Sequence, residues 1–135
     1  MKSIEYKKHG NKTLALILRA GYKKDGIEFF TPDDFPQQLG YMKHKAGHKI
    51  IPHIHNKVTR EVHYTFEVLF IKSGKVNVNF YDDDKSFISS EILYEGDVIM
   101  LAFGGHGFDI IEDSEMIEVK QGPYVGDDDK SRFNP

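Results

Sequence analysis

The stretch HYTFEVLFIKSGKVNVNF, residues 63–80, is the strongest indicator of fold class in this 135-residue chain. Its first half is dense in aromatic and β-branched residues, which favour strands. A Ser-Gly turn follows, and residues 76–80 then alternate apolar and polar side chains with the period of two that a half-buried strand shows. The stretch predicts two strands joined by a turn, with Glu67, Leu69 and Ile71 on one face of the first strand.

Short apolar runs, separated by glycine and aspartate turns, continue on both sides of this stretch. They cover residues 13–19, 26–30, 39–45, 87–94, 98–103, 106–111 and 116–120. Many short strands at such spacing are typical of an antiparallel sandwich or barrel. The one candidate for a helical turn is TPDDFPQQ, residues 31–38, because proline and aspartate suit a helix start. We therefore predict an all-β chain.

Length and composition restrict the class of protein further. The chain has the size of one domain, and 39% hydrophobic residues are enough for a core. We expect a single domain over residues 1–135, with a barrel core at about 13–121 and an extended tail at 122–135. The absence of cysteine excludes disulfides, thiolate metal sites and a cysteine nucleophile.

Charge and hydropathy indicate which compartment and which classes of partner to expect. No apolar run approaches the length that spans a bilayer, and the N-terminus lacks the apolar segment of a secretory signal. The net charge is −3 and no basic block stands out, which argues against nucleic acid as a partner. We expect a cytoplasmic protein that binds neither membranes nor nucleic acid.

Histidines carry the functional signal, since five of the seven lie between His44 and His63. His53 and His55 are two residues apart, so on a strand both imidazoles would point to one side. Glu67 is predicted on an interior face, where an ionised carboxylate is costly unless it is paired or bound to a cation. His106 follows two glycines. Three imidazoles and one carboxylate form a donor set for a divalent transition metal (Fe, Mn, Zn, Ni or Cu) and a poor one for Ca or Mg.

The order and spacing of these residues resemble the two-motif signature of the cupin superfamily. The first motif there is a glycine, five residues, HxH, a gap, a glutamate, six residues and a glycine; Gly47, His53, His55, Glu67 and Gly74 follow it here. The second motif ends in a glycine-rich turn and a histidine, which GDVIMLAFGGH, residues 96–106, approximates with Ala-Phe-Gly in place of Pro-x-Gly. The matching stretches cover the central half of the chain.

The resemblance implies a small single-domain metal-binding cupin, an antiparallel jelly-roll β-barrel. It implies His53, His55, Glu67 and His106 as the metal ligands. Eleven residues separate His55 from Glu67, where the family has three or four, so Glu61 is a second candidate for the carboxylate. Glu67 is preferred because of its spacing to the glycine that follows.

Further residues are candidates for supporting roles. His63 shares strand parity with Glu67, and the two are the candidate catalytic residues, either as acid and base or with His63 as an extra ligand. His44 and His48 are weaker candidates. The alternative for His63 is a rim histidine, and the carboxylate run at residues 82–84 is expected to be a turn.

Three classes of function remain open for such a site. The first is a metal-dependent isomerase, epimerase or lyase acting on a carbohydrate or nucleotide-sugar substrate, a suggestion by analogy with small cupins. The second is a non-haem metal dioxygenase, and the third is a non-catalytic barrel that binds or senses a small ligand. The resemblance also implies a homodimer, with the apolar strand Leu14–Leu18 as the paired or exchanged edge.

Overall fold

A computed structural model describes residues 3–135. The chain divides into two compact units: the first comprises Met1–Tyr22 and Thr65–Pro135, and the second comprises Lys23–Tyr64. Strands dominate the regular structure of both units, so the predicted all-β class is confirmed. The finer expectations, a jelly roll and one domain over residues 1–135, stay predictions.

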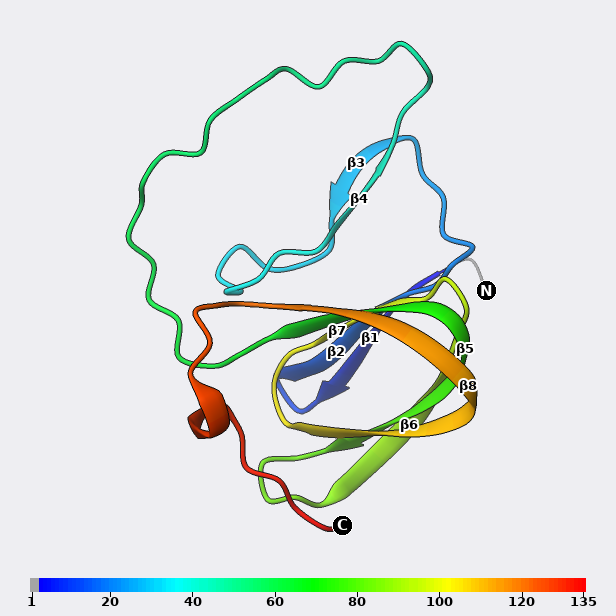
Figure 1. Ribbon diagram of the computed structural model, residues 1–135, viewed down its shortest axis with the longest axis vertical. Coiled ribbons are helices and arrows are strands. Elements are labelled where there is room, and N and C mark those ends of the chain that lie inside the picture. The colour runs from blue at the N-terminus through cyan, green and yellow to red at the C-terminus, as the bar shows by residue number, and fades with distance from the viewer. Residues whose placement is uncertain (1–2) are drawn as a thin grey trace. The chain divides into compact units, whose positions relative to one another are not determined.

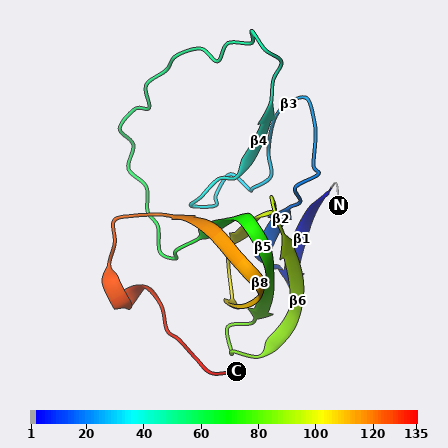
Figure 2. The ribbon, with the colours of Figure 1, turned by 45° about the vertical axis from the view of Figure 1, so that its right-hand side comes forward.

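The first unit is one curled antiparallel sheet (Figure 1). The strand order is β1-β2-β7-β5-β6. β8 lies off this path and pairs with β5. Within the described residues its strands are β1 (Ile4–His9), β2 (Lys12–Leu18), β5 (Glu67–Tyr81), β6 (Phe87–Tyr94), β7 (Val98–Leu101) and β8 (Gly105–Lys120). Figure 2 shows β8 following the curve of β5.

β5 is one long strand, not the two strands and turn that the sequence predicts. It begins at Glu67, four residues later than expected, and its pairing with β8 shifts register three times between Ile71 and Val76. Gly74 lies within this interval at φ +96°, and a Cβ there would collide with Ser114 Oγ. Extra residues in a ladder bend the strand. The Ser-Gly signal therefore marks a bend inside a strand, which glycine alone can occupy without strain.

This bend lets β5 change partners. Residues 67–70 pair with β7, whereas residues 75–81 pair with β6. The same interval explains why β8 is continuous, although Glu112-Asp113-Ser114 predicts a turn between two strands. The acidic turn residues lie where the ladder is irregular and need not end the strand.

The core fills the concave side of the curled sheet. Ala15 and Ile17 of β2 pair directly with Leu101 and Ile99 of β7, and all four side chains are almost fully buried. The rest of the buried cluster is Leu14, Leu69, Ile71, Val76, Val78, Phe80 and Leu93, with Phe108 packed against it. Leu69 and Ile71 share the interior face as predicted.

The N-terminal strands differ from the expectation in one respect. β1, which the sequence pattern does not predict, pairs with β2, and β2 also pairs with β7. Leu14–Leu18 is therefore an internal strand rather than an exposed edge, and the predicted edge role for it is wrong. The homodimer itself stays a prediction.

A buried arginine network connects β1, β2 and β6. The Arg19 guanidinium is 3% exposed and donates to Glu5 Oε2 at 2.8 Å, to Asp97 Oδ2 at 2.9 Å and to the Ile92 carbonyl at 2.7 Å. Glu91 Oε2 of β6 is 3.3 Å from its Nη2. Three carboxylates and a carbonyl thus satisfy one buried cation, which is what makes its burial tolerable.

The second unit contains a two-stranded antiparallel sheet of β3 (Gly26–Phe29) and β4 (Gly40–Lys43). Residues 31–38 between these strands are not helical; the Phe35 N–H donates to the Pro32 carbonyl at 3.1 Å in a turn. From residue 44 to 64 the chain is irregular and almost entirely exposed.

After β8, the expected tail includes a 3-10 turn, η1 (Gly126–Asp129). In the part of the chain that the structure describes, no helix has the length and hydropathy needed to cross a membrane.

Candidate functional site

Glu67 opens β5 at the point where three strands meet. It pairs with Leu101 of β7 on one side and with Lys120 of β8 on the other. Its side chain shares the face of the buried Leu69 and is only 13% exposed. The sequence prediction of an inward-facing carboxyl group is therefore confirmed.

His106 lies near the start of β8, opposite Phe80 at the far end of β5. Gly104, just before β8, has φ +79°, and a Cβ there would be 2.6 Å from the Tyr81 carbonyl oxygen. The glycine therefore permits the close approach that starts the strand. Cross-strand partners share a face, so the imidazole is on the concave side with Phe80.

The curl of the sheet brings these two residues together. The thirteen residue-to-residue steps of a straight strand from Glu67 to Phe80 would span about 43 Å. Instead, Glu67 Oε1 lies 3.9 Å from the Nε2 of His106, the partner of Phe80. Two of the four predicted ligands thus meet through the bend at Gly74 and the pairing of β5 with β8.

Glu118 of β8 is a third member of the site, which the motif spacing does not reveal. It pairs with Leu69, so its side chain emerges on the same concave face. A hydrogen bond joins its carboxyl group to that of Glu67, and Lys120 Nζ is 3.6 Å from its Oε2. Strand alternation could have indicated this: in MIEVK, residues 116–120, Glu118 lies between Ile117 and Val119, so its side chain is on the opposite face of the strand from theirs.

The pKa values of the two carboxyl groups are shifted in opposite directions. Burial raises the pKa of Glu67 to about 7, and the neighbouring Glu118 carboxylate adds to this. The hydrogen bond from Glu67 lowers the pKa of Glu118 below its ordinary value of 4.5. Burial, and secondarily the positive charge of Lys130, lowers the pKa of His106. Near neutral pH Glu67 is therefore partly protonated, and the lowered pKa of His106 favours its neutral imidazole.

These groups line a cavity of about 740 Å³, within the range of small-molecule sites. Strand residues supply one part of its lining and the C-terminal segment, residues 130–135, supplies the other. The strand lining consists of Glu67, Asn79, Tyr81, Gly105, His106, Gly107, Phe108, Asp109 and Glu118.

The other predicted ligands and base lie in the second unit. His53 and His55 are exposed, their ring centroids are 5.1 Å apart, and His53 Nδ1 is 2.9 Å from the Ile51 carbonyl oxygen. No strand covers them, so the expectation that a strand aligns the two rings is wrong. His63 is exposed, with Nε2 3.4 Å from Glu61 Oε1, and it is not in β5, so its strand parity with Glu67 is also wrong.

The weaker histidine candidates interact with each other. The rings of His44 and His48 stack with centroids 4.0 Å apart. Among residues 3–135, no three histidine, aspartate or glutamate side chains are grouped closely enough to hold a metal ion. The four-ligand set of His53, His55, Glu67 and His106 stays a prediction.

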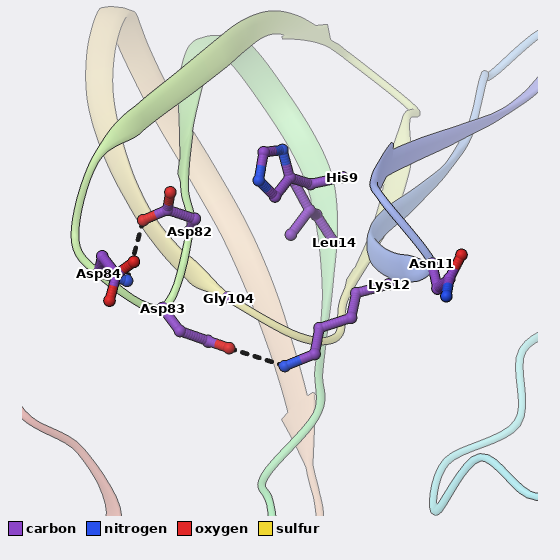
Figure 3. A pocket seen from close by; sticks show the side chains of 8 residues that line it. All are labelled: His9, Asn11, Lys12, Leu14, Asp82, Asp83, Asp84 and Gly104. Atoms are coloured by element: carbon purple, nitrogen blue, oxygen red, sulfur yellow. Dashed lines mark hydrogen bonds and ion pairs between the residues drawn. The ribbon is translucent and has the colours of Figure 1, made fainter.

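A second cavity of about 380 Å³ lies in the first unit beside the turn after β5 (Figure 3). Asp82 Oδ1 accepts from the backbone N–H groups of Asp84 and Ser86, both at 2.9 Å. Asp83 Oδ2 accepts from Lys12 Nζ at 2.7 Å. The aspartate run therefore shapes a turn, as predicted.

Comparison of the chain with protein-family models, with curated proteins and with solved structures gives no match. The cupin resemblance therefore depends on the motif residues alone.

Proposed function

We propose that this protein is a small-molecule enzyme whose site is the cavity at Glu67 and His106. The observation that carries the proposal is the 3.9 Å approach of the two side chains on the concave face. A carboxyl group and an imidazole in a cavity of this size form a common arrangement for proton transfer. The reaction class that this favours is an isomerase, epimerase or lyase acting on a carbohydrate-type substrate.

Glu118 favours this class over the dioxygenase and the ligand sensor. It bonds to the Glu67 carboxyl group and so orients it, while Lys120 orients Glu118 in turn. In our proposal Glu67 exchanges a proton with a carbon or hydroxyl group of the substrate. His106 hydrogen-bonds a substrate oxygen, and Phe108 keeps water away from that side of the imidazole.

Our proposal includes a divalent transition metal (Fe, Mn, Zn, Ni or Cu). The donor types fit in part, because Glu67 and His106 supply one oxygen and one nitrogen ligand and are already close together. His53 and His55 are the predicted remaining ligands. Bound there, the ion would polarise a carbonyl or hydroxyl oxygen of the substrate.

The test is the elemental analysis of protein purified without a metal-affinity tag. We expect near-stoichiometric metal in the wild type and a strong loss in His53→Ala/His55→Ala and in His106→Ala. His44→Ala/His48→Ala is the matched control, because it removes two exposed histidines of the same unit and should retain the metal. Circular dichroism verifies that each variant is folded.

The outcomes separate the three classes. Mn, Zn or Ni with turnover of sugar phosphates or sugar nucleotides under anaerobic conditions supports the proposal. Fe or Cu with oxygen consumption would replace it with the dioxygenase. Absence of metal in every protein, even after reconstitution, contradicts the metal-dependent form, and ligand-linked stabilisation without turnover would indicate a binding module.

A further inference from the structure

The lining of the Glu67–His106 cavity is completed by an irregular segment. Residues 130–135 follow η1 and line the cavity together with the strands, and they include two cations, Lys130 and Arg132. The function proposed above uses neither of them.

Aromatic packing and a hydrogen bond hold this segment on the sheet. The Phe133 ring packs edge-on against Tyr81, with centroids 5.1 Å apart, and Lys85 Nζ lies 5.9 Å from the Phe133 ring centroid. A Cβ on Gly105 would be 3.2 Å from Phe133 Cζ, so the glycine makes room for the ring. Upstream, Thr65 Oγ1 donates to Asp129 Oδ1. The cavity lining therefore has a defined position.

The charges around the cavity are arranged asymmetrically. Lys120 is 3.6 Å from Glu118, and Asp109 accepts a hydrogen bond from Asn79 at 2.9 Å. Lys130 and Arg132, by contrast, have no carboxylate within 4.0 Å among the described residues. The strands thus present groups that bind hydroxyls, whereas the C-terminal segment presents two cations that, within residues 3–135, are in no contact ion pair; Lys130 acts on Glu67 and Glu118 only at longer range.

We infer that the cavity binds a polyhydroxylated anion, with its phosphate or carboxylate at Lys130 and Arg132 and its hydroxyl groups at Glu67, Glu118 and His106. The inference rests on the proposed function and extends it by naming the substrate class. Arg132 can hold a phosphate or carboxylate through two parallel hydrogen bonds, and Lys130 adds a point charge. The carboxyl groups of the strands accept hydrogen bonds from hydroxyls and repel a second anionic group.

The experiment measures binding of four probes to the protein as purified, by isothermal calorimetry. Glucose 6-phosphate and gluconate have both features, glucose lacks the charge, and inorganic phosphate lacks the hydroxyl chain. We expect at least one of the first two to bind at least about tenfold more tightly than glucose and than phosphate, because a hydrogen bond to a charged group is worth that much. The Lys130→Gln/Arg132→Gln variant should lose this preference. Lys8→Gln/Lys23→Gln is the control, because it removes two exposed cations outside the cavity lining and should bind like wild type.

A third variant tests whether the position of the cations matters. Phe133→Ala retains every charge but removes the packing on Tyr81, so binding of the anionic sugars should weaken as in the double variant. Equal affinity for all four probes, no binding of either anionic sugar, or unchanged binding in the Lys130→Gln/Arg132→Gln variant would overturn the inference.

Metal analysis of the same samples separates this result from the proposed function. Metal that is retained in Lys130→Gln/Arg132→Gln, together with lost anion preference, supports both. Anion binding that depends on Arg132 in a protein without metal supports the ligand class and contradicts the metal-dependent enzyme.

Discussion

Two clusters of charged side chains lie within the first unit, and they differ in how completely their charges are paired. Around Arg19, three carboxylates and a carbonyl surround one buried cation, so every charge has a partner. Around Glu67, a second carboxyl group is the hydrogen-bond partner, and among the described residues Lys120 beside Glu118 is the only lysine or arginine within 4.0 Å of the pair, with Lys130 acting at longer range. The first arrangement stabilises the sheet, whereas the second retains unused binding capacity, which is typical of a functional site.

The pKa values follow this contrast. The hydrogen bond from Arg19 lowers the pKa of Glu5, although burial opposes this. Burial lowers the pKa of Arg19 itself, but hydrogen bonds with Glu5 and Asp97 outweigh that effect and raise it. The pKa of Glu67 rises to about 7 instead. Charge pairing dominates in one cluster and burial in the other.

The largest expected effect comes from removing the buried cation. Arg19→Met leaves Asp97 and Glu5 without their partner, and a broken buried pair costs about 3–5 kcal/mol. Urea unfolding at pH 7 measures the loss. Lys24→Met, which removes only the exposed pair with Glu28, should cost less than about 0.5 kcal/mol. Similar losses in the two variants would contradict the structural role of the Arg19 cluster.

The second-largest loss of stability is expected at the bend that brings Glu67 and His106 together. Gly74→Ala forces a side chain into a positive-φ position and against Ser114, which should cost about 2–4 kcal/mol in the free energy of unfolding, measured in urea. Gly10→Ala is the control, because Gly10 has φ +60° but a Cβ there would meet nothing within 4 Å, and about 1 kcal/mol is expected. Equal costs would show that the crowding at Gly74 is unimportant.

The raised pKa of Glu67 predicts a pH dependence of stability opposite to that of the arginine cluster. Its pKa in the folded state, about 7, exceeds the ordinary value of 4.5, so the unfolded chain ionises first and the folded state loses stability as pH rises from about 4.5 to about 7. We expect the free energy of unfolding of EDTA-treated Glu67→Gln to fall by roughly 1–2 kcal/mol less over this pH range than that of the wild type. Urea midpoints at pH 5 and pH 8 give the comparison. An identical slope in wild type and variant argues against the buried, paired carboxyl group.

Glu5 should give the smallest effect, with the reverse sign. Its lowered pKa contributes stability that is present above pH 4.5 and is lost as pH falls below that value. Glu5→Gln should therefore reduce stability at pH 7 by about 1 kcal/mol and flatten the acid limb of the profile, as followed by urea midpoints from pH 3 to pH 7. Glu28→Gln removes one partner of a more exposed ion pair and is the comparison; its cost at pH 7 should be below about 0.5 kcal/mol.

Local sequence pattern was sufficient to predict most of the strands and the inward direction of Glu67. Period-two alternation and β-branched residues report which face of a strand is buried, because the side-chain period is a local property. Local preference also placed the aspartate run in a turn. It failed where glycine and acidic residues mark a bulge inside a strand, since a bulge and a turn share local signals.

The meeting of His106 with Glu67, and the presence of Glu118, Lys130 and Arg132 in the same cavity, follow from tertiary structure alone. These contacts depend on the bend at Gly74 and on a strand pairing between distant parts of the chain, which local preference does not specify. Motif spacing named Glu67 and His106 but not the second carboxyl group or the cations, because a resemblance identifies only the residues that its pattern contains. Register and curl, not residue type, assemble this site.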